Sequence, residues 1–566
     1  MNQSPELFCQ DPPRLDNQFD DDRMLRSLLS RRFGDSLGDV VPQLRAMGEL
    51  AGGSLYQMQL DDRRNEPVLT QWDAWGQRID QIELSPLWRR AAVIAAESGL
   101  IATAYERRWG PLSRSLQFAL VYLFHPSSDV YTCPLAMTDG AARTLIAAKN
   151  RKLTDRAIPR LTSRDPGLAW TSGQWMTEAS GGSDVGRSET RAVPDQDRWR
   201  LYGRKWFTSA ATSEMALTLA RPEGNGPGGR GLALFYLETR DDEGRLDGIR
   251  VCRLKDKLGT RKVPTAELIL DGCPAQLVAG ADNGVQQIVP MLEMTRTWNS
   301  VCAVSAMRRG IALSRDYARR RIAFGRTLSE QPLHLDTLAW LQARTEAAFH
   351  LCFYLVDLVG RREADGLGEL ASAELRLLTS LTKLTTGREA VAVISEIIES
   401  FGGAGYVEDT GLPTLLRDTQ VLPIWEGTTN VLALDLLRAL AVTDGPTPIL
   451  ALVERCRATC IDPRLVEASA LAQVSVRRAC EWYQQRRGEE HRERLEAGSR
   501  RLALVLGQAA GLALLCEHAQ WALEHEQDRR PADAAARLAA HGFARLYESP
   551  AEASAVLAMD ASGADQ

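Results

Sequence analysis

The chain has 566 residues, of which 44% are hydrophobic and 25% are charged, and its formal net charge is −5. This length is too great for one hydrophobic core and predicts three or four globular domains, while the net negative charge offers no overall attraction to nucleic acid or to an anionic membrane. The ten cysteines form no Cys-x-x-Cys pair and the seven histidines show no zinc spacing, so we expect neither a metal site nor a disulfide framework.

Residues 1–45 form an acid-rich, proline-containing extension with one short helix. Its first part, residues 1–22, lacks the basic start and the apolar run of a signal peptide, so we expect no export and a cytoplasmic location. The longest apolar stretch, residues 502–516, is shorter than the roughly 20 residues that a membrane span needs. We therefore expect no membrane span.

The spacing of the apolar residues changes twice along the rest of the chain. Residues 46–170 show helical spacing, and residues 171–284 contain short β-compatible runs separated by turns rich in Gly, Pro and Asp. Helical spacing returns over residues 285–442 and continues over residues 443–566. The pattern predicts an α+β multidomain protein in which a β domain lies between two helical domains, with an additional helical domain at the carboxyl end.

The stretch Leu422-Pro423-Ile424-Trp425-Glu426-Gly427-Thr428-Thr429-Asn430 places a carboxylate between a bulky apolar pair and a glycine. Apolar neighbours raise the pKa of a carboxyl group, and glycine lets a ligand or the backbone approach closely, which suits a general base. The alternative is a loop glutamate in front of a helix over residues 431–437, with Thr428 or Thr429 as its N-cap.

Two further motifs lie in the predicted β domain. Residues 176–185 (MTEASGGSDV) combine adjacent glycines with hydroxyl side chains that suit a polar cofactor, although Gly-Gly-Ser-Asp is also an ordinary turn. Residues 205–209 (KWFTS) place two aromatic rings beside two hydroxyls at the end of a predicted strand. A flat cofactor ring could pack there, and a plain core strand explains the pattern equally well.

Two more motifs lie in the second helical domain. In residues 317–325 (YARRRIAFG), Arg321 and Phe324 are three positions apart, so at a helix end they offer a cation for pyrophosphate and a ring for stacking. The alternative is a solvated arginine-rich turn. Residues 401–406 (FGGAGY) could direct a helix start toward a phosphate or could merely end a helix.

In this order and on these domains, the five motifs resemble those of the acyl-CoA dehydrogenase flavoproteins over residues 46–440. The resemblance implies an amino-terminal helical domain, a middle β-barrel or sandwich domain and a carboxy-terminal four-helix bundle. It also implies FAD-dependent α,β-oxidation of an acyl thioester, carried by CoA or a carrier protein, to its 2-enoyl form. A base and the flavin on opposite sides of the substrate suit this chemistry, because two C–H bonds break together.

Carried over position by position, the resemblance assigns Glu426 as the catalytic base. Met294-Thr295-Arg296 stands where some relatives carry the base on an earlier helix, and Thr295 cannot serve. Substrate contacts fall on Ser183, Arg296, Trp425 and Gly427. FAD contacts, some of them across a subunit boundary, fall on Met176, Thr177, Ser183, Trp206, Thr208, Arg321, Phe324, Gln331, Gly402, Gly403, Thr428 and Asn430. A homodimer or homotetramer and electron transfer to an electron-transfer flavoprotein are further implications.

Stretches outside the common core, among them residues 13–17, 72–80 and 133–138, look like the AidB-like branch of this family, which adds a carboxy-terminal helical domain. That branch implies an alternative function: a flavoprotein of the DNA alkylation response that binds DNA and has little dehydrogenase turnover. Residues 451–566 carry 15 Arg, no Lys and 17 acidic residues. A tail without net positive charge favours the dehydrogenase and a role in covering the core or in assembly.

Overall fold

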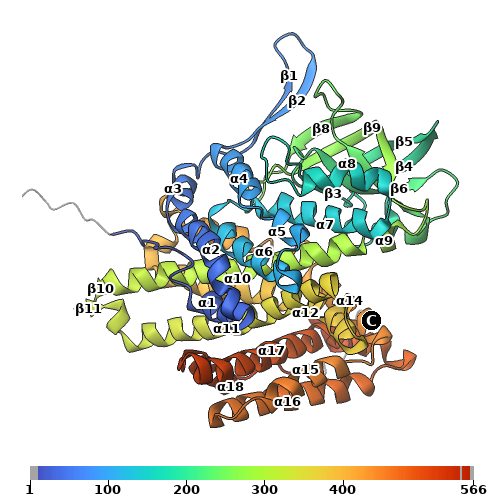
Figure 1. The fold of residues 1–566 in the computed structure, drawn as a ribbon. Coiled ribbons are helices and arrows are strands. Elements are labelled where there is room, and N and C mark those ends of the chain that lie inside the picture. The colour runs from blue at the N-terminus through green and yellow to red at the C-terminus, as the bar shows by residue number, and fades with distance from the viewer. Residues whose placement is uncertain (1–10, 548–550, 561–566) are drawn as a thin grey trace, which may run out of the picture.

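The computed structural model describes residues 11–547 and 551–560 (Figure 1). Its first part is a domain of helices whose apolar faces meet a core shared with the rest of the chain. Every residue of the sixth helix is buried, because neighbouring helices surround it. These helices are α1 (Arg23–Phe33), α2 (Leu37–Gly52), α3 (Ser54–Asp61), α4 (Pro86–Glu97), α5 (Ala102–Glu106), α6 (Ser113–Phe124), α7 (Thr132–Ala148) and α8 (Arg151–Leu161).

A two-stranded antiparallel hairpin, β1 (Val68–Trp72) and β2 (Arg78–Glu83), interrupts this helical region and projects from the top of the molecule in Figure 1. Helical spacing does not predict it. Its own sequence explains it: burial alternates along β1, and the turn between the strands contains a glycine with positive φ, Gly76. The side chain of Trp75 in that turn is 92% exposed.

The middle of the chain folds into a closed β-barrel, as predicted for a β domain. Strand β6 pairs with β4 along one edge and with β7 along the other, while β4, β5, β9 and β7 pair in succession and complete the ring. The barrel encloses a separate apolar core. Its strands are β3 (Ser172–Trp175), β4 (Arg191–Asp195), β5 (Arg198–Thr208), β6 (Met215–Pro222), β7 (Ala233–Glu238), β8 (Ile249–Leu254) and β9 (Ala266–Leu277).

Long helices then form a bundle whose central member is α10 (Val289–Arg320). Most of α10 is buried, because α7, α11 (Pro332–Ala364) and α12 (Glu369–Ser400) pack around it. A small hairpin follows its carboxyl end, far from the barrel in Figure 1. The remaining elements of the bundle region are α9 (Gly284–Gln287), β10 (Ile322–Ala323), β11 (Arg326–Thr327), α13 (Leu412–Thr419) and α14 (Thr429–Val442).

The tail forms a further helical layer below the bundle in Figure 1. Its longest helix, α17 (Arg492–His525), packs against α11, α12 and α14. The segment Glu489–His525 is long and apolar enough to cross a membrane, but 83% of its most apolar window is buried inside the protein, which is typical of a core helix. The other tail helices are α15 (Thr447–Ala458), α16 (Pro463–Gln484), α18 (Arg530–His541) and α19 (Ala551–Met559).

Candidate active site

Glu426 lies in the short loop between α13 and α14, with its backbone in the left-handed region at φ +58°. Gly427 follows at φ +104°. A non-glycine residue in this region is strained, and such strain persists only where the surroundings impose it. Thr428 then caps α14, because its side chain accepts a hydrogen bond from the backbone N–H of Val431. Capping by Thr428 is confirmed, and it leaves the role of Glu426 open.

Three side chains from two bundle helices hold this loop. The hydroxyl of Thr295, near the start of α10, donates to Oε2 of Glu426. The next residue, Arg296, donates from Nε to the backbone carbonyl of Glu426 at 3.2 Å. From α12, Nζ of Lys383 donates to the backbone carbonyl of Gly427. The carboxylate and two successive carbonyls of the loop are thus each bound by a side chain of the bundle.

The electrostatics of the loop raise the basicity of the Glu426 carboxylate. Burial raises the pKa of Glu426, while Thr295, Arg296 and Lys383 oppose that shift. Gln174, on the barrel strand β3, also opposes it, although the hydrogen bond that its side chain donates goes to the sulfur of Met176. Burial lowers the pKa of Lys383 to about 7. Shifted pKa values of this kind are typical of sites that move protons.

The predicted substrate contacts near the base are partly engaged with the protein itself. Trp425 donates from its indole N–H to Oδ1 of Asn299, and Nδ2 of Asn299 donates to the carbonyl of Leu422 at 3.2 Å. The guanidinium of Arg296 lies 2.9 Å from a carboxylate oxygen of Asp435. Arg296 therefore holds the loop, and its contact with substrate stays a prediction, as do those of Trp425, Gly427 and the exposed Ser183.

The barrel brings together the first group of predicted cofactor residues. The backbone N–H of Trp206 donates to the carbonyl of Thr177 at 3.0 Å, which joins the glycine-rich turn to β5. The same two segments are joined by the buried ion pair between Lys205 and Glu178, 2.7 Å apart. Thr177 and Trp206 remain partly exposed, as does Met176. Thr208 is buried, and its hydroxyl donates to the carbonyl of Ala266.

The second group lies at the opposite end of the bundle. Arg321 follows α10, 26 residues after Thr295, and at about 1.5 Å per helical residue the two are roughly 39 Å apart. Phe324, in the β10–β11 turn, is 99% exposed, and the side chain of Gln331 donates to the carbonyl of Ala323 at 2.9 Å. Gly402 and Gly403 are also exposed. They follow Phe401, whose ring contacts that of Tyr317 near the end of α10. One chain therefore does not bring the two groups together.

The last predicted cofactor residue, Asn430, faces the tail: its side-chain oxygen accepts from Arg500 of α17 at 3.3 Å. Thr295, Asn299 and Lys383 are contacts of the base loop that sequence reasoning did not single out as such. For Lys383 a signal exists, because it is the one lysine within α12 and lies in an otherwise uncharged stretch, residues 377–387.

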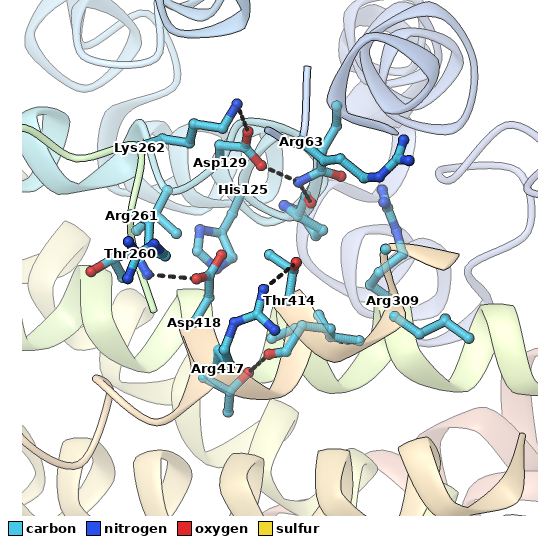
Figure 2. A pocket seen from close by; sticks show the side chains of 18 of the residues that line it. Arg63, His125, Asp129, Thr260, Arg261, Lys262, Arg309, Thr414, Arg417 and Asp418 are labelled. Atoms are coloured by element: carbon cyan, nitrogen blue, oxygen red, sulfur yellow. Dashed lines mark hydrogen bonds and ion pairs between the residues drawn. The ribbon is translucent and has the colours of Figure 1, made fainter. Parts of the chain in front are cut away.

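Val421 and Leu422, which precede the base in the chain, line a cavity of about 130 Å³. Figure 2 shows this cavity with Asp418 and the basic side chains around it. Asp418 lines it and accepts from the backbone N–H of Thr260 at 2.6 Å, and burial raises its pKa to about 7. The basic side chains around the cavity all have partners within the chain: Arg63 with Asp409, Arg261 with Glu66 and Asp256, Lys262 with Asp62, Arg417 with Glu408, and Arg309 with the Ala51 carbonyl and Ser127. The cavity lies where the first helical domain, the barrel and the bundle meet, because residues of all three line it.

Comparisons with known proteins agree on one family. Family models match for the acyl-CoA dehydrogenase C-terminal domain over residues 282–441, for the middle domain over residues 173–273, and for the adaptive response protein AidB N-terminal domain over residues 2–166. Acyl-CoA dehydrogenase family member 11 of Caenorhabditis elegans is 46% identical over 77% of this chain and 72% of its own length. The putative acyl-CoA dehydrogenase AidB of Escherichia coli is 30% identical over 74% and 76%.

Solved structures extend the similarity to the whole chain. The crystal structure of Caenorhabditis elegans ACDH-11 in complex with C11-CoA superposes with a TM-score of 0.93 at 38% identity, covering 99% of this chain and 97% of that one. Butyryl-CoA dehydrogenase from Megasphaera elsdenii shares the fold with a TM-score of 0.59 at 17% identity, covering 71% of this chain and 98% of that one.

Proposed function

Because this chain belongs to the acyl-CoA dehydrogenase family, and its amino-terminal region to the AidB-like branch, we propose that it oxidises an acyl-CoA thioester to the 2-enoyl thioester with Glu426 as the base. The observation that carries this proposal is the loop of Glu426: a carboxylate with a raised pKa, held by α10 and α12. Such a carboxylate accepts the α-proton of a thioester as the C=C bond forms.

The family consists of flavoproteins, and we propose FAD as the cofactor. FAD would supply the acceptor for the hydride that leaves the β-carbon. The residues present fit such a group. Thr177 and Trp206 remain partly exposed on the barrel, and within the described part of the chain only immediate chain neighbours lie within 4 Å of where a Cβ on Gly402 or Gly403 would stand. Exposed Phe324 offers a ring for stacking.

Arg321, in the second group of cofactor residues, lies roughly 39 Å along α10 from Thr295, which binds the base, and this separation supports a site completed by a second chain. We therefore propose a homodimer or homotetramer in which Thr177 of one chain and Arg321 of another serve the same FAD. Electrons would pass to an electron-transfer flavoprotein, in the cytoplasm. The C11-CoA bound to ACDH-11 supports an acyl-CoA substrate for this chain. On that similarity we propose CoA, and not a carrier protein, as the acyl carrier.

The test is anaerobic mixing of purified protein with saturated acyl-CoAs of increasing chain length while the flavin absorbance is followed. We expect a yellow protein whose flavin bleaches with at least one of them. A folded protein that cannot be loaded with FAD, or loaded protein that no acyl-CoA reduces, would refute the proposal.

The AidB-like branch supports the alternative, DNA binding with little turnover. Against it, several arginines of the tail are engaged with carboxylates, among them Arg464 with Asp533 at 2.7 Å and Arg477 with Glu454 at 2.8 Å. Phosphate binding by the tail would have to compete with these pairs. Duplex binding that weakens steeply with salt, and that is lost on deleting residues 443–566, would favour the alternative.

A further inference from the structure

Lys383 is a fully buried lysine in the middle of α12. Its ammonium donates to the backbone carbonyl of Gly427, the residue after the proposed base. Among the residues that the structure describes, no carboxylate lies within ion-pair distance of it, although the charge of Glu426 is close enough to oppose the fall in its pKa. A buried ammonium normally needs a carboxylate partner, so its position requires an explanation.

The other buried lysines show what a structural role looks like in this protein. Lys205 lies 2.7 Å from a carboxylate oxygen of Glu178, and Lys262 lies 2.9 Å from one of Asp62. Each is neutralised by its partner and ties two segments together. Lys383 instead places an uncompensated positive charge beside a strained loop, which is a costly arrangement for holding a single carbonyl.

The loop that Lys383 contacts is the one that most needs support. Glu426 and Gly427 are both in positive-φ conformations, and their carbonyls accept from Arg296 and Lys383, on opposite helices. We propose that Lys383 is a positioning residue for Glu426. Lys383 fixes the peptide group of Gly427, which follows the base, and its positive charge favours the carboxylate form of Glu426. This inference rests on the proposed role of Glu426.

The charges around Glu426 come from several elements. Arg296 approaches it from α10, Lys383 from α12 and Cys133 from α7, where the negative charge of Glu426 contributes to a raised pKa of the thiol. Asp435 of α14 pairs with Arg296 at 2.9 Å, and the same carboxylate also lies 3.6 Å from Arg376. Arg296 thus has a carboxylate partner at ion-pair distance, whereas Lys383 has none among the described residues.

The test uses Lys383→Met, which removes charge and hydrogen bond, and Lys383→Gln, which keeps an N–H donor but no charge. Without the positive charge the Glu426 carboxylate is less favoured, so its pKa rises further and the rate of substrate-driven flavin reduction should need a higher pH. We expect a rate per bound FAD at least about tenfold lower than wild type below pH 7 for both variants, since general-base assistance is large. Because burial lowers the pKa of Lys383 to about 7, its charge is lost above that pH, and Lys383→Gln should approach wild type there.

Lys262→Met is the matched control. It removes another buried lysine, which lies far from the base in sequence and forms an ion pair with Asp62. It should lower stability without moving the pH profile. A second readout needs no turnover: the infrared carboxyl band that is absent from Glu426→Gln should titrate at higher pH in both Lys383 variants. An unmoved band and an unmoved profile in either folded variant would overturn the inference. Wild-type protein that no acyl-CoA reduces would instead refute the proposed function, while the band still tests Lys383.

Discussion

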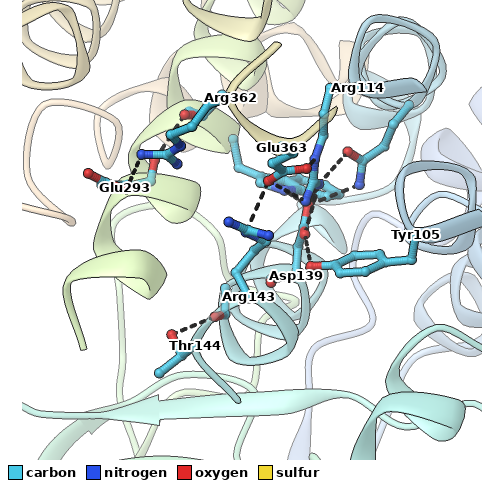
Figure 3. A network of polar contacts seen from close by, with 12 residues as sticks. Tyr105, Arg114, Asp139, Arg143, Thr144, Glu293, Arg362 and Glu363 are labelled. Carbon is cyan, nitrogen blue, oxygen red and sulfur yellow. Dashed lines mark hydrogen bonds and ion pairs between the residues drawn. The ribbon is translucent and has the colours of Figure 1, made fainter. Parts of the chain in front are cut away.

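Two clusters of buried polar side chains lie on α10, and they differ in how completely they are paired. One is centred on Asp139 of α7 and reaches α10 through Trp298 (Figure 3). The other is the loop of Glu426, bound by Thr295 and Arg296 on the same helix.

In the Asp139 cluster each charge meets an opposite one. Arg114 lies 2.7 Å from Asp139 and 2.7 Å from Glu363, and Arg143 lies 3.0 Å from Glu363. Tyr105 and Trp298 donate to Asp139 as well. Burial acts to raise the pKa of Asp139, but these partners outweigh it and leave the pKa below its usual value.

In the Glu426 cluster the balance is reversed. Burial raises the pKa of Glu426 and its donors do not cancel that shift. Arg296 and Lys383 bind backbone carbonyls of the loop, and in the part of the chain that the structure describes no cation lies within ion-pair distance of the Glu426 carboxylate. A carboxylate held by an ion pair and several donors keeps its charge to lower pH, whereas one whose pKa is raised takes a proton more readily. The difference separates a cluster that holds domains together from one that can react.

The largest effect that would sharpen this contrast is expected for Glu426→Gln. The change keeps size and polarity but removes the proton acceptor, so flavin and ligand should still bind while substrate-driven reduction falls by roughly 10²–10⁴-fold, as expected for loss of a general base. Stopped-flow reduction, normalised to bound FAD, measures it. Glu396→Gln, an exposed position on α12, is the control. A rate within about threefold of wild type would remove Glu426 from the mechanism, given the size expected for a base.

The opposite outcome is expected for Asp139→Asn. Losing one partner of a buried ion pair costs about 3–5 kcal/mol of stability, because Arg114 keeps its charge in an enclosed site. The midpoint of urea unfolding should fall while flavin reduction per bound FAD is retained. Since the pKa of Asp139 is lowered, this contribution is present at neutral pH and is lost as the pH falls below the usual carboxylate range.

The control for Asp139→Asn is Asp336→Asn, which removes an exposed pair with Arg537 at 2.7 Å. Exposed pairs contribute little, so its unfolding midpoint should stay near that of wild type. Equal losses in the two variants, or a loss of per-flavin rate in Asp139→Asn alone, would break the contrast between the clusters.

The sequence allows prediction of the β domain between helical domains, because the apolar period changes near residues 171 and 285. The family resemblance and the fold class are confirmed. The sequence does not predict the hairpin at residues 68–83, because its short alternation of exposed and half-buried side chains lies within a region of helical spacing. Glu426 stands out locally, but Lys383 and Thr295 meet its loop only through folding, 44 and 131 residues away. The roles of the predicted site residues stay predictions.

The smallest effect, and the most specific, is expected for Thr295→Val. The hydroxyl of Thr295 favours the carboxylate form of Glu426, so its removal raises the pKa of Glu426 further, and a smaller fraction of the base is ionised at low pH. The flavin reduction rate should therefore fall on the acidic side of its pH profile and match wild type on the alkaline plateau. The effect is limited because the hydroxyl has one proton and a second acceptor, the Leu292 carbonyl at 3.2 Å.

Thr297→Val, two residues along the same helix, is the matched control, since that buried hydroxyl donates to the carbonyl of Glu293 at 2.9 Å and does not bind the base. It should leave the pH profile in place. Stopped-flow reduction across the pH range compares the two variants. A profile that moves equally in both, or that moves to lower pH in Thr295→Val, would mean that the hydroxyl does not stabilise the Glu426 carboxylate. Arg296 and Lys383 would then be the groups from α10 and α12 that favour the carboxylate form of Glu426.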